Sequence, residues 1–82
     1  MNEFMTDEEQ IYISAVRYGI GRKTYITSVI ANFMMKQELS EKCKFIMIRD
    51  IENERDSKLS DKPLGDECDK KSWLALLEYL KK

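Results

Sequence analysis

The chain has 82 residues, a formal net charge of −1 and no histidine. This length is enough for one domain with one core, and a hydrophobic share of 43% rules out wholesale disorder. The near-neutral charge argues against a general nucleic-acid binder, which usually carries a basic excess. No apolar run reaches membrane-spanning length, and residues 1–6 lack the cationic start and apolar region of a signal peptide. We therefore expect a small, soluble, cytoplasmic domain.

The two cysteines, Cys43 and Cys68, stand far apart in the sequence. A structural zinc site needs four ligands, usually Cys and His, so the absence of histidine nearly excludes one. Free thiols are the default state in a reducing cytoplasm, and a disulfide is the alternative. We expect no cofactor and no metal site.

Apolar residues recur at helical spacing in four segments, which predicts an all-α fold. The predicted helices span residues 7–18, 24–37, 41–55 and 69–81, in a single domain over residues 1–82. Residues 1–5 are expected to fray, and residues 56–66 are rich in turn formers and should form a loop. The first three helices should pack together, and the fourth should close the core through Trp73.

Capping residues mark the helix ends. The expected N-caps, in chain order, are Thr6, Thr24, Ser40, and either Asp66 or Asp69. Glu9 stands at the capping-box position of the first helix. Gly19 or Gly21 should end that helix as a left-handed cap. The short, partly alternating run at 43–48 could instead be a strand, but the cap before it and the polar continuation to Arg55 favour a helix.

Charge is divided unevenly along the chain. No acidic residue occurs from Gln10 to Gln37, whereas residues 50–69 carry eight acids and three cations. Such an asymmetry can steer a partner, or the two halves can pair inside the fold. Internal pairing is the default expectation, because a small domain folds its halves against one another.

The junction between the first two helices, residues 17–25, holds the candidate interaction residues. Arg22, Lys23 and Tyr25 form a cation–aromatic patch of a kind that is enriched in binding hot spots. Because charges in a turn are usually solvated, we expect these residues to contact a partner and to contribute little to the fold.

Arg17 has a different expected role, because it precedes the turn and its stem should be partly covered. Asp50 falls beside the apolar stripe of the third helix, where a carboxylate needs a partner. We predict that Arg17 pairs with Asp50 or with the acidic pair Asp66 and Asp69; Arg22 is the other candidate partner of Asp50.

Other motifs carry weaker signals. The glycines at 19 and 21 lack the spacing of a phosphate-binding loop and follow no predicted strand, so a helix end and turn is the better interpretation. Acid pairs at helical spacing, Asp50 with Glu54 and Asp66 with Asp69, could bind a hard cation, although solvated or internally paired acids are favoured. No nucleophile stands beside a base, so we do not expect an enzyme. Two helices joined by a glycine-containing turn also fit a helix-turn-helix DNA reader, although the basic count is small.

Two patterns suggest a family. They are Arg17-Tyr18-x-x-Gly21-Arg22-x-Thr24-Tyr25 and Gly65-Asp66-x-x-Asp69-x-x-x-Trp73. Over residues 8–80 the chain resembles a group of small proteins encoded by phages and mobile elements of Gram-positive bacteria. The resemblance implies an accessory protein, in the manner of an anti-CRISPR, that binds and inhibits a host protein such as a CRISPR or other defence nuclease, alone or with its nucleic acid. The alternatives are a small DNA-binding regulator and a virion assembly protein.

Overall fold

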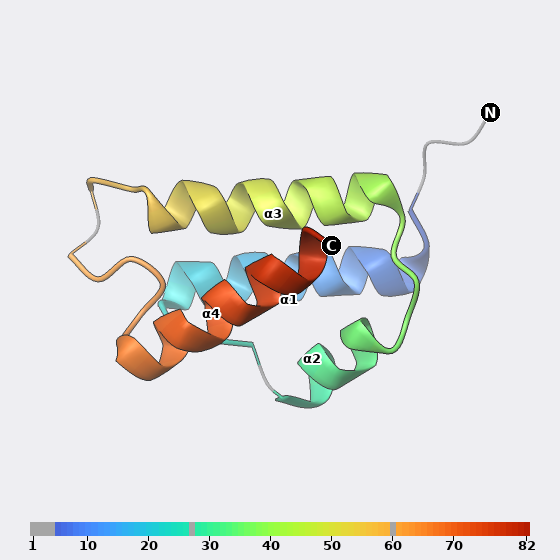
Figure 1. The fold of residues 1–82 in the computed structure, drawn as a ribbon, viewed down its shortest axis with the longest axis horizontal. Helices are drawn as coiled ribbons and strands as arrows, with labels where there is room; N and C mark the ends of the chain where they lie inside the picture. Colours follow the sequence, from blue (N-terminus) through green and yellow to red (C-terminus); the bar gives the residue numbers. More distant parts are fainter. Residues whose placement is uncertain (1–4, 27, 60) are drawn as a thin grey trace.

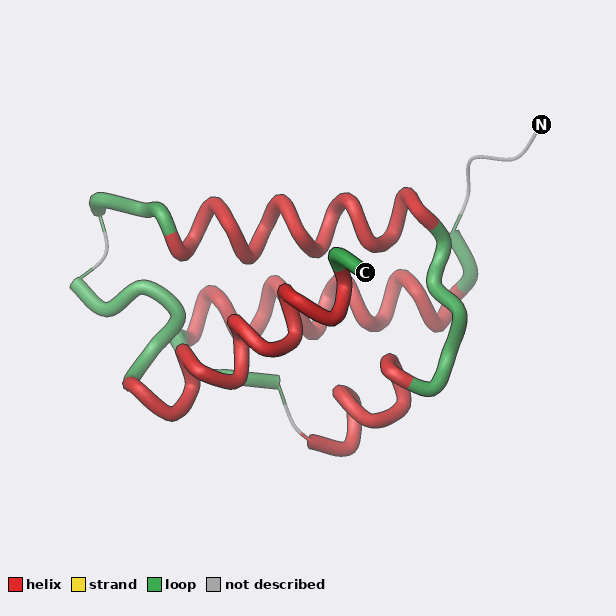
Figure 2. Tube along the Cα trace, in the orientation of Figure 1, coloured by secondary structure: helices red, strands yellow, loops and turns green. Residues whose placement is uncertain are grey.

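The computed structural model describes residues 5–26, 28–59 and 61–82, and within these ranges it contains four α-helices and no strand (Figures 1 and 2). The helices are α1 (Asp7–Arg22), α2 (Ser28–Met35), α3 (Glu41–Arg55) and α4 (Glu67–Leu80). The predicted all-α class is confirmed. The predicted fraying of residues 1–5 falls on residues 1–4, which lie outside the described residues, and on Met5, which packs against the core.

The two longest helices, α1 and α3, lie side by side and run in the same direction, and α4 returns across them (Figure 1). The short helix α2 packs only against α1 among the helix pairs in close contact, and it lies along the lower edge of the view. The molecule measures 41 × 24 × 22 Å. This arrangement leaves one side of α1 facing α3 and another side next to α2.

The core forms where α4 closes over the other helices. Trp73 of α4 is fully buried, as predicted, and the ring of Tyr25 packs edge-on against it with 5.0 Å between ring centroids. The other large, fully buried side chains are Val16, Met34, Cys43, Met47, Ile51, Leu64, Leu76 and Leu80. All four helices therefore contribute to one core, as expected for a domain of this size.

The start of α1 follows its sequence signals, and its end does not. Thr6 and Glu9 form the predicted capping box. The helix nevertheless continues through Gly19 and Gly21, and the left-handed residue is Lys23 (φ 58°). Gly19 has a packing role instead, because a Cβ there would lie 2.8 Å from the carbonyl oxygen of Thr24 and 3.0 Å from the Trp73 ring. The predicted glycine cap is wrong: Lys23 takes the left-handed conformation, and the small size of Gly19 serves close packing against Thr24 and Trp73.

Helix α2 is shorter than predicted, since it begins at Ser28 and not near residue 24. Thr24 therefore does not cap it. The backbone N–H of Tyr25 donates to Asp69 Oδ1 at 3.1 Å, and Ile26 is buried. Residues 24–26 are thus tied to the start of α4, which keeps them out of the helix. At the other end, the N–H of Gln37 bonds back by only three residues, so the chain makes a turn after Met35.

The remaining two helices agree closely with the sequence. Helix α3 has the predicted bounds and the predicted Ser40 cap, so the run at 43–48 is helix and not strand. Helix α4 starts two residues earlier than predicted, after Asp66, whose side chain accepts the N–H of Asp69 at 2.9 Å. The turn before it contains Gly65 at φ +91°, where a Cβ would lie 2.5 Å from the Lys23 carbonyl oxygen. That glycine is required both by its backbone angle and by the close approach of the α1–α2 junction.

Candidate functional site: a groove beside α1

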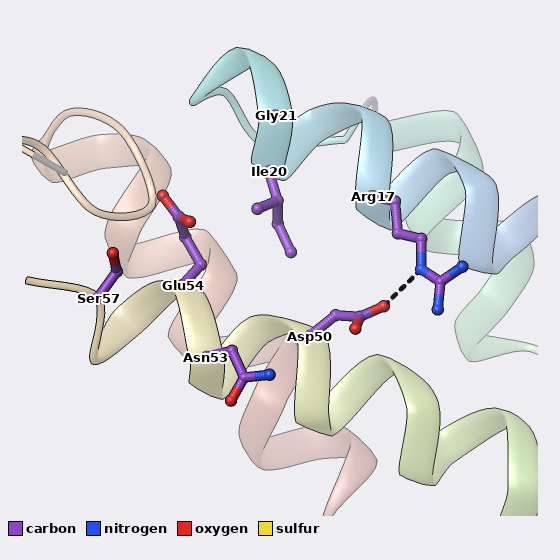
Figure 3. A pocket seen from close by; sticks show the side chains of 7 residues that line it. All are labelled: Arg17, Ile20, Gly21, Asp50, Asn53, Glu54 and Ser57. Carbon is purple, nitrogen blue, oxygen red and sulfur yellow. Dashed lines mark hydrogen bonds and ion pairs between the residues drawn. The ribbon is translucent and has the colours of Figure 1, made fainter. Parts of the chain in front are cut away.

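Of the residues predicted to pair, Arg17 and Asp50 are in contact, whereas Asp66 and Asp69 lie at the start of α4. Arg17 Nε donates to Asp50 Oδ2 at 2.8 Å and joins α1 to α3 (Figure 3). The Arg17 side chain is 55% exposed and that of Asp50 is 17% exposed. Arg17 is therefore more open to solvent than the sequence suggested, and the pair tethers two helices at the surface.

Asp66 and Asp69 have structural roles at the start of α4. Asp66 caps the helix. The hydrogen bond from the backbone N–H of Asp69 holds the pKa of the Asp66 carboxyl below its ordinary value. Asp69 accepts the N–H of Tyr25, as described above. Neither is seen paired with Arg17. Across the part of the chain that the structure describes, no group of three or more acids, cysteines or histidines is placed to hold a metal ion.

Oppositely charged residues that are far apart in the sequence form ion pairs between helices. Besides the Arg17–Asp50 pair, Lys23 Nζ lies 3.8 Å from Glu54 Oε2, which links the end of α1 to the end of α3. Lys81 at the end of α4 pairs with Glu52 of α3. The carboxylates in the second half of α3, Asp50, Glu52 and Glu54, therefore lie beside cations from α1 and α4.

Three of these charged residues, Arg17, Asp50 and Glu54, line a cleft of about 310 Å³ between α1 and α3 (Figure 3). Its lining residues are Arg17, Ile20, Gly21, Asp50, Asn53, Glu54 and Ser57. Figure 3 shows Arg17 turned toward Asp50 across the cleft. Arg17 and Asp50 pair with each other at the cleft, whereas Glu54 Oε2 has no hydrogen-bond partner among the described residues and lies 3.8 Å from Lys23 Nζ.

The predicted partner-binding residues separate into different environments. Tyr25 is half-buried against Trp73, and burial raises the pKa of its hydroxyl. Arg22 is exposed and its guanidinium lies 5.3 Å from the ring centroid of Tyr18. Tyr18 itself is 65% exposed. Tyr25 therefore belongs mainly to the core, and Tyr18, which the sequence reasoning did not select, is the exposed aromatic side chain of this junction.

Tyr18 belongs to a second apolar stripe on α1, distinct from the stripe that faces the core. Ile11, Ser14, Ala15 and Tyr18 follow the i, i+3, i+4, i+7 spacing of one helix face. They form one wall of a groove of about 650 Å³. The opposite wall comes from the α1–α2 connection and α2, with Thr24, Tyr25, Ile26 and Ile30. A helical-periodicity search for a second stripe would have found this face.

The apolar surface is larger than the groove alone. Ile11 is 59% exposed, and on α2 Val29 and Phe33 are 61% and 58% exposed. Helix α2 contains no charged residue. Scattered apolar side chains on a surface are ordinary, but exposed apolar side chains that line a groove, as Ile11 and Tyr18 do, can mark an interaction site.

Charges stand at the two ends of the α1 stripe. Asp7 is in the first turn of α1, and with Gln10, Ile11 and Ser14 it lines a depression of about 440 Å³ that adjoins the groove. Arg22 is in the last turn. The outer face of α1 is thus apolar along its middle, acidic at its N-terminal end and basic at its C-terminal end.

Comparison with protein-family models, curated proteins and solved structures finds no significant match to this chain. Among the helices in the described ranges, none combines the length and apolarity that crossing a membrane requires.

Proposed function

We propose that this protein acts by binding another protein, and that its groove receives an amphipathic helix of that partner. The observation that carries the proposal is the pair of exposed side chains Ile11 and Tyr18, which flank an apolar groove on a domain that already has a complete core. A folded domain gains nothing in stability from such exposure. A partner that covers these side chains gains the free energy of their burial.

A helix suits the groove better than a strand or a flat surface. Helix α1 has 16 residues, which corresponds to about 24 Å at 1.5 Å per residue. Ser14 and Ala15 stand in the middle of its stripe, where small side chains let another backbone approach closely. Amphipathic helices bind such grooves through anchors at i, i+3, i+4 and i+7, which is the spacing of the groove wall itself.

The biological role that we propose is that of a phage or mobile-element accessory protein, which inhibits a host macromolecule such as a CRISPR or other defence nuclease. Inhibition by docking needs a surface and no catalytic group. The support for the role is the resemblance of the two sequence patterns together with the presence of a docking groove. In this structure, Gly65, Asp69 and Trp73 of the second pattern brace the junction that forms one end of the groove.

A DNA-binding regulator is supported less well. A recognition helix presents polar and basic side chains to base edges and phosphates. Helix α2 would have to be that helix, and it presents Val29 and Phe33 to solvent and carries no charge. Two of the cations near the junction, Arg17 and Lys23, lie beside carboxylates of α3.

The proposal is tested by capture from host lysate with the wild-type chain and two matched variants. Ala15→Arg places a long charged side chain in the groove, and Ala75→Arg makes the same change at an exposed position of α4. We expect the wild type and Ala75→Arg to retain a partner that Ala15→Arg loses, with all three folded by circular dichroism. Equal capture by Ala15→Arg would show that the groove is not the docking surface. A salt-sensitive shift of random duplex DNA would favour the regulator instead.

A further inference from the structure

We infer that the groove is occupied, when no other partner is present, by α1 of a second copy of this chain, packed antiparallel to the first. The inference rests on the docking groove of the proposed function, and it names the first occupant. In an antiparallel helix pair related by a two-fold axis, the two partners of each contact lie at equal distances on either side of the stripe's centre. On α1 that centre lies between Ser14 and Ala15.

The apolar part of the stripe is self-complementary about this centre. Ser14 of one copy faces Ala15 of the other, so two small residues meet where the helices cross. Ile11 faces Tyr18, so each of the two large exposed side chains meets its complement. Small residues at the crossing and large ones on either side allow two helices to approach and then fill the space at the ends.

The charges at the ends obey the same two-fold relation. Asp7 of one copy faces Arg22 of the other, and the contact occurs twice in the dimer. A parallel pairing would place Asp7 against Asp7 and Arg22 against Arg22. The antiparallel pairing also sets the positive end of each helix dipole beside the negative end of the other.

The second wall of the groove adds contacts that a bare α1 pair would lack. Ile26 and Ile30 stand across the groove from the α1 stripe. A second copy of α1 seated in the groove would lie between these residues and the stripe. The dimer would therefore cover apolar surface of both α1 and α2 in each copy, in a continuous layer of helices.

Sedimentation equilibrium over a dilution series tests this pairing with the intact chain. We expect the wild type and Ala75→Arg to form a reversible dimer, and Ala15→Arg to be monomeric with an unchanged far-ultraviolet spectrum. Should Ala15→Arg not fold, the charge variants carry the test. Asp7→Arg and Arg22→Asp should each weaken the dimer about tenfold, because each creates two like-charge contacts in place of two ion pairs.

The decisive comparison is the rescue. An equimolar mixture of Asp7→Arg with Arg22→Asp restores opposite charges at both ends, and so does the double variant, so each should dimerise like the wild type. A wild type that stays monomeric, a dimer that survives Ala15→Arg, or a lack of rescue would each overturn the inference. If the wild type is monomeric while Ala15→Arg still loses its captured partner, the second copy is excluded as the occupant and the proposed function stands.

Discussion

The carboxylate of Glu9 accepts the backbone N–H of Ser40 at 2.7 Å and, through its other oxygen, the N–H of Thr6 at 3.2 Å. Thr6 and Ser40 are the N-caps of α1 and α3. One side chain therefore ties together the starts of the two longest helices, and it is 7% exposed. Further along the same pair of helices, Arg17 contacts Asp50 and Lys23 lies beside Glu54, so contacts hold the parallel arrangement from the start of the pair to its end.

Glu9 should make stability depend on pH. The Ser40 backbone N–H lowers the pKa of the Glu9 carboxyl below its ordinary value. The charged form is thus favoured by folding, so its contribution is complete above the ordinary pKa and is lost as the pH falls through the folded-state pKa. We expect Glu9→Gln to cost about 1–3 kcal/mol near neutral pH, since hydrogen bonds to a charged group are lost.

The measurement is denaturant unfolding of the wild type and Glu9→Gln at a series of pH values. The difference in unfolding free energy should shrink as the solution becomes acid, because protonation removes the advantage of the carboxylate. Glu8→Gln is the matched control, since Glu8 is an exposed neighbour in the same helix turn. A difference in unfolding free energy that stays constant into acid would show that the charge of Glu9 has no part in holding the starts of α1 and α3 together.

Two glycines of the α1 end should respond in opposite ways to alanine. A Cβ at Gly19 would lie 2.8 Å from the Thr24 carbonyl oxygen, whereas a Cβ at Gly21 meets nothing within 4 Å. Gly19→Ala should therefore destabilise the fold by about 1–3 kcal/mol through overpacking. Gly21→Ala should stabilise it by about 0.5–1 kcal/mol, because it reduces the freedom of the unfolded chain. Thermal melts of both variants decide the matter, and equal shifts would contradict the close approach seen at Gly19.

Trp73 should dominate the stability of the core. Its side chain is fully buried, and its indole N–H has no hydrogen-bond partner among the described residues. Trp73→Ala should cost about 3–5 kcal/mol. Trp73→Phe should cost less, since it keeps an aromatic side chain and removes the unpaired N–H. An unchanged midpoint for Trp73→Ala in a denaturant titration would mean that the indole is exposed.

The two free cysteines should differ in reactivity. Cys68 is exposed at the start of α4, whereas Cys43 is buried in α3. Burial, and then the charge of Glu9, raise the pKa of the Cys43 thiol to about 11. At about pH 8 a thiol reagent should therefore modify Cys68 rapidly and Cys43 only on unfolding, because the thiolate is the reactive form. Rapid modification of two thiols per native chain, counted by mass spectrometry, would contradict the buried position of Cys43.

The sequence predicted best those features that depend on neighbouring residues. Thr6 with Glu9, and Ser40, act within one helix turn, and their caps appear where the pattern placed them. The pairing of Arg17 with Asp50 was expected because a carboxylate beside an apolar stripe needs a partner, and the two do lie in contact.

The sequence was least informative where distant segments meet. Glycine is a residue type that often ends helices, but the small size of Gly19 instead lets Thr24 and Trp73 pack closely against it. Tyr25 is a residue type that is common among binding anchors, but its ring packs against Trp73 in the core. The stripe that contains Tyr18 follows helical spacing, but the groove beside it exists only once residues 24–26 and Ile30 are placed, because the groove needs both walls. These features depend on how the α1–α2 junction sits on α4, which no local pattern specifies.

Site-directed photo-cross-linking from position 18 tests the docking groove most directly. Tyr18 is replaced by p-benzoylphenylalanine, and the matched control carries the same residue at Phe45, which is 63% exposed on α3. We expect the position-18 probe to react with a helical segment that carries apolar residues at i, i+3, i+4 and i+7: residues around Ile11 of a second copy in the purified protein, and the partner's helix in host lysate. A position-18 probe that stays unreacted in both, while the position-45 probe cross-links, would contradict the account and move the interaction surface away from α1.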